Sequence, residues 1–334
     1  MRAVVCTALG PYREVLEVRE VPEPKLPPGG VRLKVGAAGV SFANILQIAG
    51  THQHKMPPPF TPGTEVAGTV IEVAPDVTSV KVGDRVLGGG GSGCYAEQVI
   101  VGGDVAFKLP QNGDFAEATS FATLYGTAWG ALRWRADIQP GEVLLVSGAA
   151  GGTGLAAIDL GKLFGATVIA VVGGPEKVAA AREQGADHVI DHQGEDVRER
   201  VLALTSGRGA DAVFDPVGGG FTEIALRCIT PEGRLLVIGF AGGTIPQLPA
   251  NILLVKNIAA MGIYWGTYLG WGRTPPPNFA RVQAAYKEMM QFWGEGRIRP
   301  RVHARFPLDR AADALDRLAQ RRAIGKVVLD LNAS

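Results

Sequence analysis

The stretch that decides the fold is Val143-Leu-Leu-Val-Ser-Gly-Ala-Ala-Gly-Gly-Thr-Gly154, where a short apolar run leads into a turn rich in glycine. The residues that follow, up to Phe164, are mostly apolar and contain no proline. A short apolar run before such a turn is typical of a buried strand, and a longer apolar segment is typical of a helix. The stretch therefore predicts a strand over Val143–Val146, a tight turn, and a helix over Gly154–Phe164.

Predicted strands and helices then alternate along the chain. Further strands are expected at Thr167–Val172, His188–Ile190, Ala212–Phe214 and Arg234–Ile238, and segments with helical spacing separate them. This alternation predicts an α/β fold with a doubly wound parallel sheet and helices on both faces. Before it, to about residue 120, short apolar runs bounded by proline and glycine predict a β-rich region.

Composition and charge exclude several classes of protein. The 33 Lys and Arg are balanced by 32 Asp and Glu, so no basic surplus favours nucleic acid as a partner, and no polybasic run suggests a membrane surface. No stretch of about 18 apolar residues is present to span a membrane. The three cysteines, Cys6, Cys94 and Cys228, cannot form a disulfide scaffold and favour a reducing compartment, so a cytoplasmic protein is expected.

The turn after Val146 resembles the G-x-G-x-x-G pattern that binds the pyrophosphate of a dinucleotide. Gly151 and Gly154 fit its second and third glycines, whereas Ala149 replaces the first and Gly148 stands beside it. Glycine lets the backbone approach the phosphates, and the helix N-terminus offers N–H groups and a positive dipole end. A tight turn without a ligand is the alternative. The residues predicted to contact the cofactor here are Gly148, Ala150, Gly151, Gly152, Thr153 and Gly154.

The end of the second predicted strand bears on which dinucleotide binds. An NAD site usually has Asp or Glu there to hold the ribose 2′-hydroxyl, but this chain has Gly173 and Gly174. Lys177 follows at the start of the next helix, where its cation can meet a 2′-phosphate, although a solvated helix lysine is the alternative. NADPH is therefore the predicted cofactor.

Further motifs extend nearly from one end of the chain to the other: Gly39-Val-Ser-Phe-Ala-Asn44, Pro62-Gly-Thr-Glu65, Val82-Gly-Asp-Arg-Val86 and Ile324-Gly-Lys-Val-Val328. With these motifs in this order around the glycine turn, the sequence resembles the zinc-free quinone oxidoreductases of the medium-chain dehydrogenase/reductase superfamily. The resemblance implies a GroES-like, β-rich catalytic domain over residues 1–124 and a Rossmann domain over 125–266. It implies that residues 267–334 return to the catalytic domain.

The same resemblance implies that no metal takes part. Zinc-dependent relatives have Cys where Ser41 stands and His where Thr64 stands, and neither serine nor threonine is a good zinc ligand. The four-cysteine structural lobe of those relatives has no counterpart here. Without a Lewis acid, the expected chemistry is hydride transfer to an acceptor that is already electrophilic, such as a quinone or an alkene conjugated to a carbonyl.

Three residues are catalytic candidates by resemblance. Ser41 and Asn44 are expected near the nicotinamide, although relatives often carry Asn and Asp at these two positions. His52 is expected in the substrate pocket, where it could protonate an enolate-like product. The alternative for His52 is a position in a surface loop, because prolines follow it closely. His52 and His54 could also bind a metal ion together, and an exposed loop is again the alternative.

Five more residues are predicted to contact the cofactor. Gly239 and Phe240 follow a predicted sheet strand, and ligands lie at the carboxyl ends of such strands. By resemblance, Thr127 faces the nicotinamide, His192 lies near the adenine end, and Arg322 reaches the 2′-phosphate from the tail. The alternatives are a helix cap for Thr127 and a solvated helix end for Arg322.

The leading hypothesis is an NADPH-dependent reductase of quinones or similar enones. A hydrolase is disfavoured because Gly-x-Ser-x-Gly is absent, and a P-loop enzyme is excluded because no Lys-Ser/Thr follows the glycine turn. An enoyl reductase acting on an acyl thioester and a non-catalytic NADPH-binding protein remain as alternatives. A homodimer is expected, because the strand predicted at Ile258–Gly262 would lie at an exposed sheet edge. The run Gly88–Gly91 has no chemical assignment and is interpreted as a loop of the β-rich domain.

Overall fold

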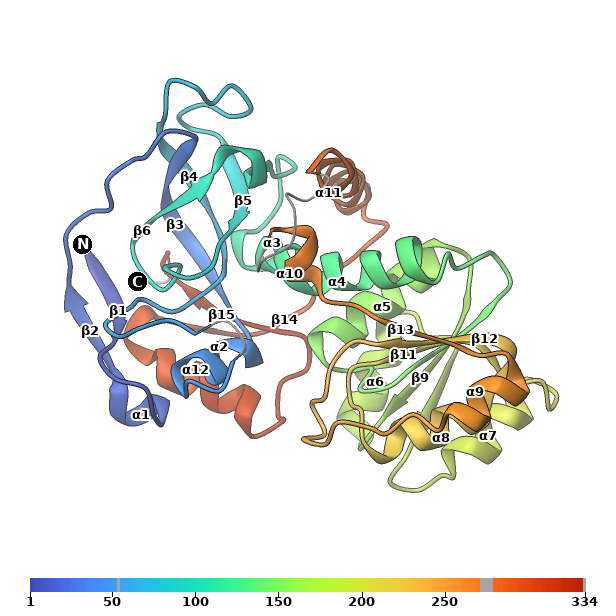
Figure 1. The fold of residues 1–334 in the computed structure, drawn as a ribbon. Helices are drawn as coiled ribbons and strands as arrows, with labels where there is room; N and C mark the ends of the chain where they lie inside the picture. The colour runs from blue at the N-terminus through green and yellow to red at the C-terminus, as the bar shows by residue number, and fades with distance from the viewer. Residues whose placement is uncertain (53–54, 271–278, 333–334) are drawn as a thin grey trace. The chain divides into compact units, whose positions relative to one another are not determined.

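The computed structural model describes residues 1–52, 55–270 and 279–332, and the chain divides into two compact units (Figure 1). Unit 1 comprises Met1–Thr123, Gly266–Gly296 and Pro300–Ser334, whereas unit 2 comprises Leu124–Trp265 and Arg297–Arg299. The two expected boundaries, 124/125 and 266/267, each lie one residue beyond these divisions. The brief return of three residues to unit 2 was not predicted, because nothing in its composition marks a boundary.

Unit 1 is built around a seven-stranded sheet, antiparallel except where β14 pairs parallel with β15, and a separate antiparallel pair of strands, β1 and β2. Its strands are β1 (Arg2–Cys6), β2 (Leu16–Glu20), β3 (Gly30–Val40), β4 (Glu65–Val73), β5 (Arg85–Gly89), β6 (Gln98–Gly102), β7 (Phe107–Lys108), β14 (Val302–Phe306) and β15 (Lys326–Asp330). Its helices are α1 (Tyr12–Val15), α2 (Phe42–Ile48), η1 (Gly103–Val105), α3 (Phe115–Ser120), α10 (Trp265–Tyr268), α11 (Phe279–Gly294), η4 (Leu308–Arg310) and α12 (Ala311–Ala319). The strand order is β14-β15-β3-β4-β5-β7, and β6 also pairs with β3.

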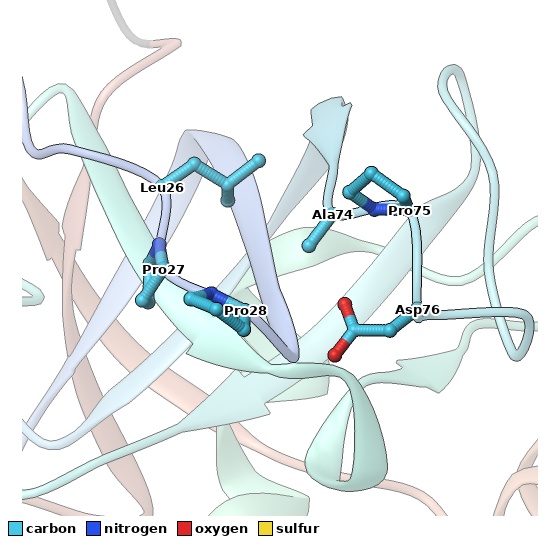
Figure 2. Close-up of a pocket in the computed structure, with 6 residues that line it drawn as sticks. All are labelled: Leu26, Pro27, Pro28, Ala74, Pro75 and Asp76. Atoms are coloured by element: carbon cyan, nitrogen blue, oxygen red, sulfur yellow. The ribbon is translucent and has the colours of Figure 1, made fainter.

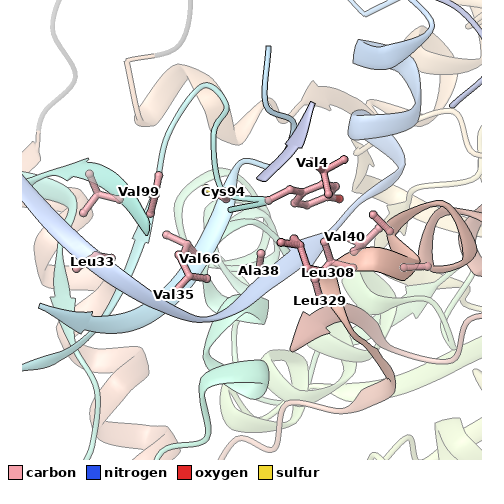
Figure 3. Close-up of a cluster of buried hydrophobic side chains, with 14 of the residues drawn as sticks. Val4, Leu33, Val35, Ala38, Val40, Val66, Cys94, Val99, Leu308 and Leu329 are labelled. Atoms are coloured by element: carbon pink, nitrogen blue, oxygen red, sulfur yellow. The ribbon is translucent and has the colours of Figure 1, made fainter. Parts of the chain in front are cut away.

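Both ends of the chain contribute to this sheet and to its core. β15, from the tail, pairs antiparallel with β3, with Val327 opposite Val40. Alternate residues of a strand face the same side, so Leu33 and Val35 of β3 point into one buried cluster. Figure 3 shows this core, which also contains Leu308 and Leu329 from the tail. The tail is therefore an integral part of unit 1.

A buried ion pair lies at the start of two of these strands. Lys326, the first residue of β15, pairs with Glu65, the first residue of β4, and their side chains are 2% and 1% exposed. The hydroxyl of Thr123 donates a hydrogen bond to the same carboxylate. Gly39 leaves room for the pair, because a Cβ atom at that position would overlap both the Glu65 carboxylate and the Lys326 ammonium group. Three of the motifs that carry the family resemblance therefore meet at one point in space.

Unit 2 contains a six-stranded parallel sheet. Its strands are β8 (Val143–Val146), β9 (Thr167–Val172), β10 (His188–Asp191), β11 (Ala210–Asp215), β12 (Ile229–Val237) and β13 (Ala259–Gly262). Its helices are α4 (Gly126–Trp129), η3 (Gly130–Arg135), α5 (Gly152–Leu163), α6 (Pro175–Glu183), α7 (Val197–Leu204), α8 (Gly220–Cys228) and α9 (Ala250–Lys256). The strand order β10-β9-β8-β11-β12-β13 places β8 beside both β9 and β11, where the direction of winding reverses.

Helices cover both faces of this sheet (Figure 1). Val143 and Leu145 of β8 join the buried cluster formed with α7 and α8. Leu144 points to the opposite face, where a Cβ atom at Gly161 of α5 would come within 2.8 Å of its side chain. The predicted α/β fold, a doubly wound parallel sheet with a GroES-like β-rich domain, is confirmed. No helix in the described part of the chain is long and apolar enough to cross a membrane.

Apolar residues recur at helical spacing from Phe115 to Leu132, but the structure of this segment is more complex than one regular helix. Between α3 and α4 the chain forms a π-helix, η2 (Phe121–Tyr125), and a second π-helix, η3, follows α4. Apolar spacing cannot distinguish such π turns from regular α turns, and π turns often occur at functional sites. η2 contains Thr123, the residue that bonds to Glu65.

We predict that Lys326→Met destabilises the protein, because it leaves the Glu65 carboxylate buried without a counter-charge. The expected loss is about 3–5 kcal/mol in the free energy of unfolding. The double variant Glu65→Gln/Lys326→Met should recover most of that loss, since it buries no charge and keeps an acceptor for Thr123. Urea denaturation of the three proteins measures the effect. Equal stability of the single variant and the native protein would contradict this account.

Candidate functional site

The glycine turn after β8 is shaped by two close backbone contacts. Gly148 has a φ of 53°, in the left-handed region that glycine adopts without strain. Gly154, in the first turn of α5, packs directly on this turn: a Cβ atom there would lie 2.5 Å from the Gly148 carbonyl oxygen and 2.7 Å from Ala149 Cα. Both positions therefore require glycine for the turn to close.

The N-terminus of α5 opens directly from this turn. Its N-cap residue, Gly151, has an extended backbone and provides no side-chain cap. The first N–H groups of an α-helix have no partner within the helix, so those of Gly152, Thr153 and Gly154 can bind an anion. This geometry fits the predicted pyrophosphate site. The individual contacts of Ala150 and of these residues with a cofactor stay predictions.

A buried carboxylate joins the glycine turn to its neighbour. Asp215, at the end of β11, is 2% exposed, and its Oδ1 accepts hydrogen bonds from Ser147 Oγ at 2.7 Å and from the N–H groups of Val217 and Gly218. Its Oδ2 accepts one from Thr222 Oγ1 at 2.7 Å. Asp215 thereby fixes the turns after β8 and β11 relative to each other. Sequence reasoning missed it, although an acid at a strand end before Pro-Val-Gly-Gly was a usable signal.

Gly239 and Phe240 lie beside this pair of turns. The N–H group of Ala241 donates to the Pro216 carbonyl at 3.0 Å, which holds the loop after β12 against the loop after β11. The Phe240 ring is close to Gly218, where a Cβ atom would lie 3.1 Å from Phe240 Cδ1, yet 42% of Phe240 is exposed. The structure thus brings Gly239, Phe240 and the glycine turn to the same carboxyl edge of the sheet, as ligand binding there requires.

Gly173 and His192 also meet. A Cβ atom on Gly173 would lie 2.7 Å from His192 Nε2, so the imidazole covers the end of β9 where an acidic residue would stand in an NAD site. Gly174 has a φ of 92° and caps α6, whose first turn contains Lys177. The residues predicted for the 2′-phosphate in unit 2 are therefore neighbours.

Asp191 is a charged neighbour that sequence reasoning missed. Its carboxylate, at the end of β10, accepts hydrogen bonds from the N–H groups of Gly174 and Gln193, both at 3.1 Å. These two bonds lower the pKa of Asp191, so the group is ionised at neutral pH. The only sequence signal was its place immediately after a short predicted strand. The negative charge of Asp191 beside the predicted phosphate site disfavours binding of the 2′-phosphate of NADPH. Its carboxylate, however, faces these two N–H groups.

Thr127 and Arg322, two further residues predicted to contact the cofactor, differ in burial. Thr127 is buried in α4, whose N-cap residue is Tyr125, so it does not cap that helix. Arg322 is exposed beyond the end of α12, in unit 1. The contacts of both residues with a cofactor stay predictions.

Ser41 and Asn44 form a polar group at the start of α2. Asn44 is completely buried, and its Oδ1 accepts hydrogen bonds from Ser41 N and Oγ, both at 2.9 Å, and from the Tyr95 hydroxyl at 3.1 Å. Burial and the nearby Glu65 carboxylate raise the pKa of Tyr95, so Tyr95 remains a donor. Asn44 therefore orients Ser41, and the half-buried Ser41 is the member of the group that a ligand can touch.

His52 is buried, with 8% of its surface exposed, which contradicts the surface-loop alternative. Its backbone N–H bonds to the Leu46 carbonyl at 3.1 Å, so the chain folds back over the end of α2 and encloses the side chain. The prolines that suggested exposure begin only after this point. His54, the partner considered for a metal site, lies outside the described residues.

Two family models match the chain: the alcohol dehydrogenase GroES-like domain over residues 27–111 and the zinc-binding dehydrogenase model over 152–284. Mouse quinone oxidoreductase-like protein 2 is 40% identical over 331 residues, which cover 99% of this chain and 92% of that protein. This chain belongs to the quinone oxidoreductase family of the medium-chain dehydrogenase/reductase superfamily.

Solved structures agree with this assignment. The quinone oxidoreductase of Escherichia coli, complexed with NADPH, has a TM-score of 0.88 and 28% identity over 99% of this chain and all of that one. The quinone oxidoreductase of Pseudomonas syringae pv. Tomato has a TM-score of 0.88 and 30% identity over 98% of this chain and 99% of that one. Members of this superfamily bind a nicotinamide cofactor, and the residues at the carboxyl edge of unit 2 fit one.

The residues of this quinone oxidoreductase family member do not fit the zinc named in one family model. By the resemblance, Ser41 and Thr64 stand where zinc-dependent relatives have ligands, and the adjacent Glu65 is already paired with Lys326. Within residues 1–52, 55–270 and 279–332, no group of three or more His, Cys, Asp or Glu side chains could hold a metal ion. Burial raises the pKa of Cys228 to about 11 and that of Cys94 still further, which opposes the thiolate form that zinc binds.

A further pocket in unit 1 contains none of the predicted site residues. Figure 2 shows this hollow of about 430 Å³ in unit 1, where the loop before β3 faces the turn after β4. The N–H group of Gly29 donates to Asp76 Oδ1 at 2.9 Å and joins the two segments. The hollow is lined by Leu26, Pro27, Pro28, Ala74, Pro75 and Asp76. It offers a single charged side chain and no group suited to redox chemistry.

We predict that Gly154→Ala weakens nicotinamide dinucleotide binding at least about tenfold, because its methyl group would push the Gly148 and Ala149 backbone out of position. Gly161→Ala is the matched control on α5, since a methyl group there meets only the flexible ends of Leu144 and Val168. Fluorescence titration with NADPH gives both dissociation constants. Equal binding by the two variants would show that the close contact at Gly154 does not shape the site.

Proposed function

We propose that this protein transfers a hydride from NADPH directly to a quinone, or to an alkene conjugated with a carbonyl group. The observation that carries this proposal is the glycine turn held by Asp215, in a protein whose described residues include no group of His, Cys, Asp or Glu that could hold a metal ion. The relatives named as quinone oxidoreductases support the same reaction class. When bound, the reduced cofactor supplies the hydride, and the protein has to bind it, orient it and stabilise the developing negative charge on the acceptor.

Named residues take these roles in the proposal. The N–H groups at the start of α5 bind the pyrophosphate, and Gly239 and Phe240 border the nicotinamide. Asn44 fixes the hydroxyl of Ser41, which is the polar group offered to the acceptor. His52 is the candidate proton donor for the product.

The preference for NADPH rests on the residues around Gly173. Lys177 and His192 can meet a 2′-phosphate, and neither glycine carries a side chain that would bind a free 2′-hydroxyl. Asp191 opposes this preference, but its carboxylate already accepts two backbone hydrogen bonds. The net effect proposed is a selective but not exclusive NADPH site.

We predict that the protein oxidises NADPH in the presence of 1,4-naphthoquinone, and that NADH is at least about tenfold poorer in kcat/KM. Lys177→Ala should reduce this difference by raising KM for NADPH alone. The assay follows absorbance at 340 nm. Activity only with crotonyl-CoA would instead identify an acyl-thioester reductase, and NADPH binding without turnover on any acceptor would identify a non-catalytic protein. Oxidation of a primary alcohol with NAD, and no reduction of quinones, would refute the proposal.

We also propose a homodimer formed through the β13 edge of unit 2. β13 ends the sheet, and the preceding α9 has no buried residue. Leu254 and Val255 of α9 are 77% and 72% exposed, which is unusual for adjacent large apolar side chains. The double variant Leu254→Glu/Val255→Glu should then shift the mass measured by light scattering from dimer to monomer. A monomeric native protein would rule the dimer out.

A further inference from the structure

The turn after β10 holds His192 at a fixed place beside β9. In the parallel pairing of these strands Asp191 lies opposite Val172, and the N–H group of His192 donates to the Val172 carbonyl at 3.0 Å. The turn then closes on itself, because the N–H groups of Gly194 and Glu195 both donate to the Asp191 carbonyl at 3.0 Å. The backbone of His192 is therefore set by the end of β9, where the ribose of a dinucleotide is expected.

Gly173 leaves the space that the imidazole of His192 occupies. A Cβ atom at Gly173 would lie 2.7 Å from His192 Nε2 and 3.0 Å from its Cε1, closer than packed side chains approach. The edge of the ring that contains Nε2 therefore lies over the backbone of Gly173, although the residue as a whole is exposed. Where an NAD site presents a carboxylate, this chain presents a nitrogen that can carry a positive charge.

Asp191 is close enough to respond to that charge. Its carboxylate accepts hydrogen bonds from the N–H groups of Gly174 and Gln193, both at 3.1 Å. These two bonds lower the pKa of Asp191, and the charge of His192 adds to the effect. A neutral imidazole does nothing against the negative charge of Asp191, whereas a protonated imidazole offsets it.

The elements packed against this turn add charges of both signs. α6 contributes Glu176 and Lys177 in its first turn, and the sequence of β9 contains no charged residue. Just before α7, Glu195 pairs with Arg200 at 2.8 Å, and Asp196 caps the helix. Histidine is the side chain that ordinarily changes its charge between about pH 5 and 8. Among the residues of this neighbourhood, the imidazole is therefore the group that responds to pH in that range.

We propose that the protonation state of His192 sets the cofactor selectivity, so that the preference for a 2′-phosphate strengthens as the pH falls below about 7. This inference rests on the proposed NADPH site and adds its regulation by protons. The protonated imidazole donates a charge-assisted hydrogen bond to a phosphate oxygen. The neutral imidazole stands beside the ionised Asp191 and leaves the selectivity to Lys177.

The direction of the effect follows from the linkage between the two events. Because the phosphate binds the protonated form better, its binding draws a proton onto the imidazole. The gain in affinity therefore develops as the pH falls through the range in which the complex is protonated and the free protein is not. It is lost again as the pH rises through that range.

Calorimetric titration with NADP⁺ and with NAD⁺, at about pH 5.5 and about pH 8 and constant ionic strength, tests the inference. The oxidised cofactors are used because NADPH decomposes in acid. The ratio of the two dissociation constants should favour NADP⁺ at least about fivefold more at the lower pH. A native ratio that does not rise overturns the inference.

Two variants separate the charge of His192 from its shape. His192→Gln keeps a hydrogen-bonding side chain without a charge, so its ratio should stay level or decline, since a phosphate monoester itself takes up a proton at about pH 6. His192→Arg carries a permanent charge and should already be selective at about pH 8, with no rise at the lower pH. A rise in His192→Gln equal to that of the native protein overturns the inference.

His188 provides the matched control. It is the first residue of β10, so it lies at the end of the strand opposite to His192, and it is half-buried. His188→Gln should retain the pH dependence of the native protein. Loss of that dependence in His188→Gln as well would show that it comes from the stability of the strand, and would overturn the inference.

Proton uptake separates this inference from the proposed function. Titration with NADP⁺ at about pH 7, in two buffers of different ionisation enthalpy, should show net proton uptake by the native protein and none by His192→Gln. Uptake that depends on His192, without turnover of any acceptor, would retain the inference and refute the reductase. Quinone turnover without such uptake would retain the reductase and refute the inference. Failure of NADP⁺ to bind at either pH would refute both.

Discussion

Unit 1 depends on the buried pair between Glu65 and Lys326. Two charges removed from water are costly unless their geometry is good and their remaining hydrogen-bonding positions are filled. Here Thr123 supplies a further donor, and Gly39 supplies the space. The pair joins the first residue of β4 to the first residue of β15, so the early and late parts of the chain can form this arrangement only together. It also holds Thr123, whose hydroxyl bonds to the same carboxylate.

Asp215 plays a corresponding part in unit 2. It is also a buried carboxylate, but four hydrogen-bond donors balance its charge in place of a cation. Two of these donors are backbone N–H groups of the turn after β11, and one is Ser147, which begins the glycine turn. A charge that needs all of these donors holds the two turns at defined positions. Preorganisation of this kind lowers the cost of binding an anionic ligand at the helix N-terminus.

The sequence predicts the elements of unit 2 better than their contacts. The bounds of β8 and β9 match the predicted ranges, because compact apolar runs between clear turns define them. β12 begins at Ile229, five residues before the predicted strand, since Pro231 and Gly233 hide its start. The π-helices of residues 121–125 and 130–135 were not predicted, because apolar spacing does not resolve one extra residue in a turn.

The residues of the candidate site that act through their backbone were predicted from the sequence. Those whose roles depend on partners elsewhere in the fold were missed. The glycine turn, Gly173 and Gly239 follow predicted strands, and strand ends gather at one edge of a parallel sheet. The roles of Asp191 and Asp215 depend on N–H groups presented by turns, which no local pattern reports. His52 is buried because the chain folds back over the end of α2.

The two glycine runs differ in the reason that glycine stands in them. At Gly148 and Gly154 the backbone itself leaves no room for a Cβ atom or requires a left-handed φ, so glycine there is a condition of the turn. At Gly90 the fold has room for a side chain, and the absence of one leaves empty space in a pocket of unit 1 that Phe107 and Tyr286 also line. The first kind of glycine shapes the backbone of the turn that we propose binds the phosphates of the cofactor. The second kind leaves open space in the pocket, which any larger residue would fill.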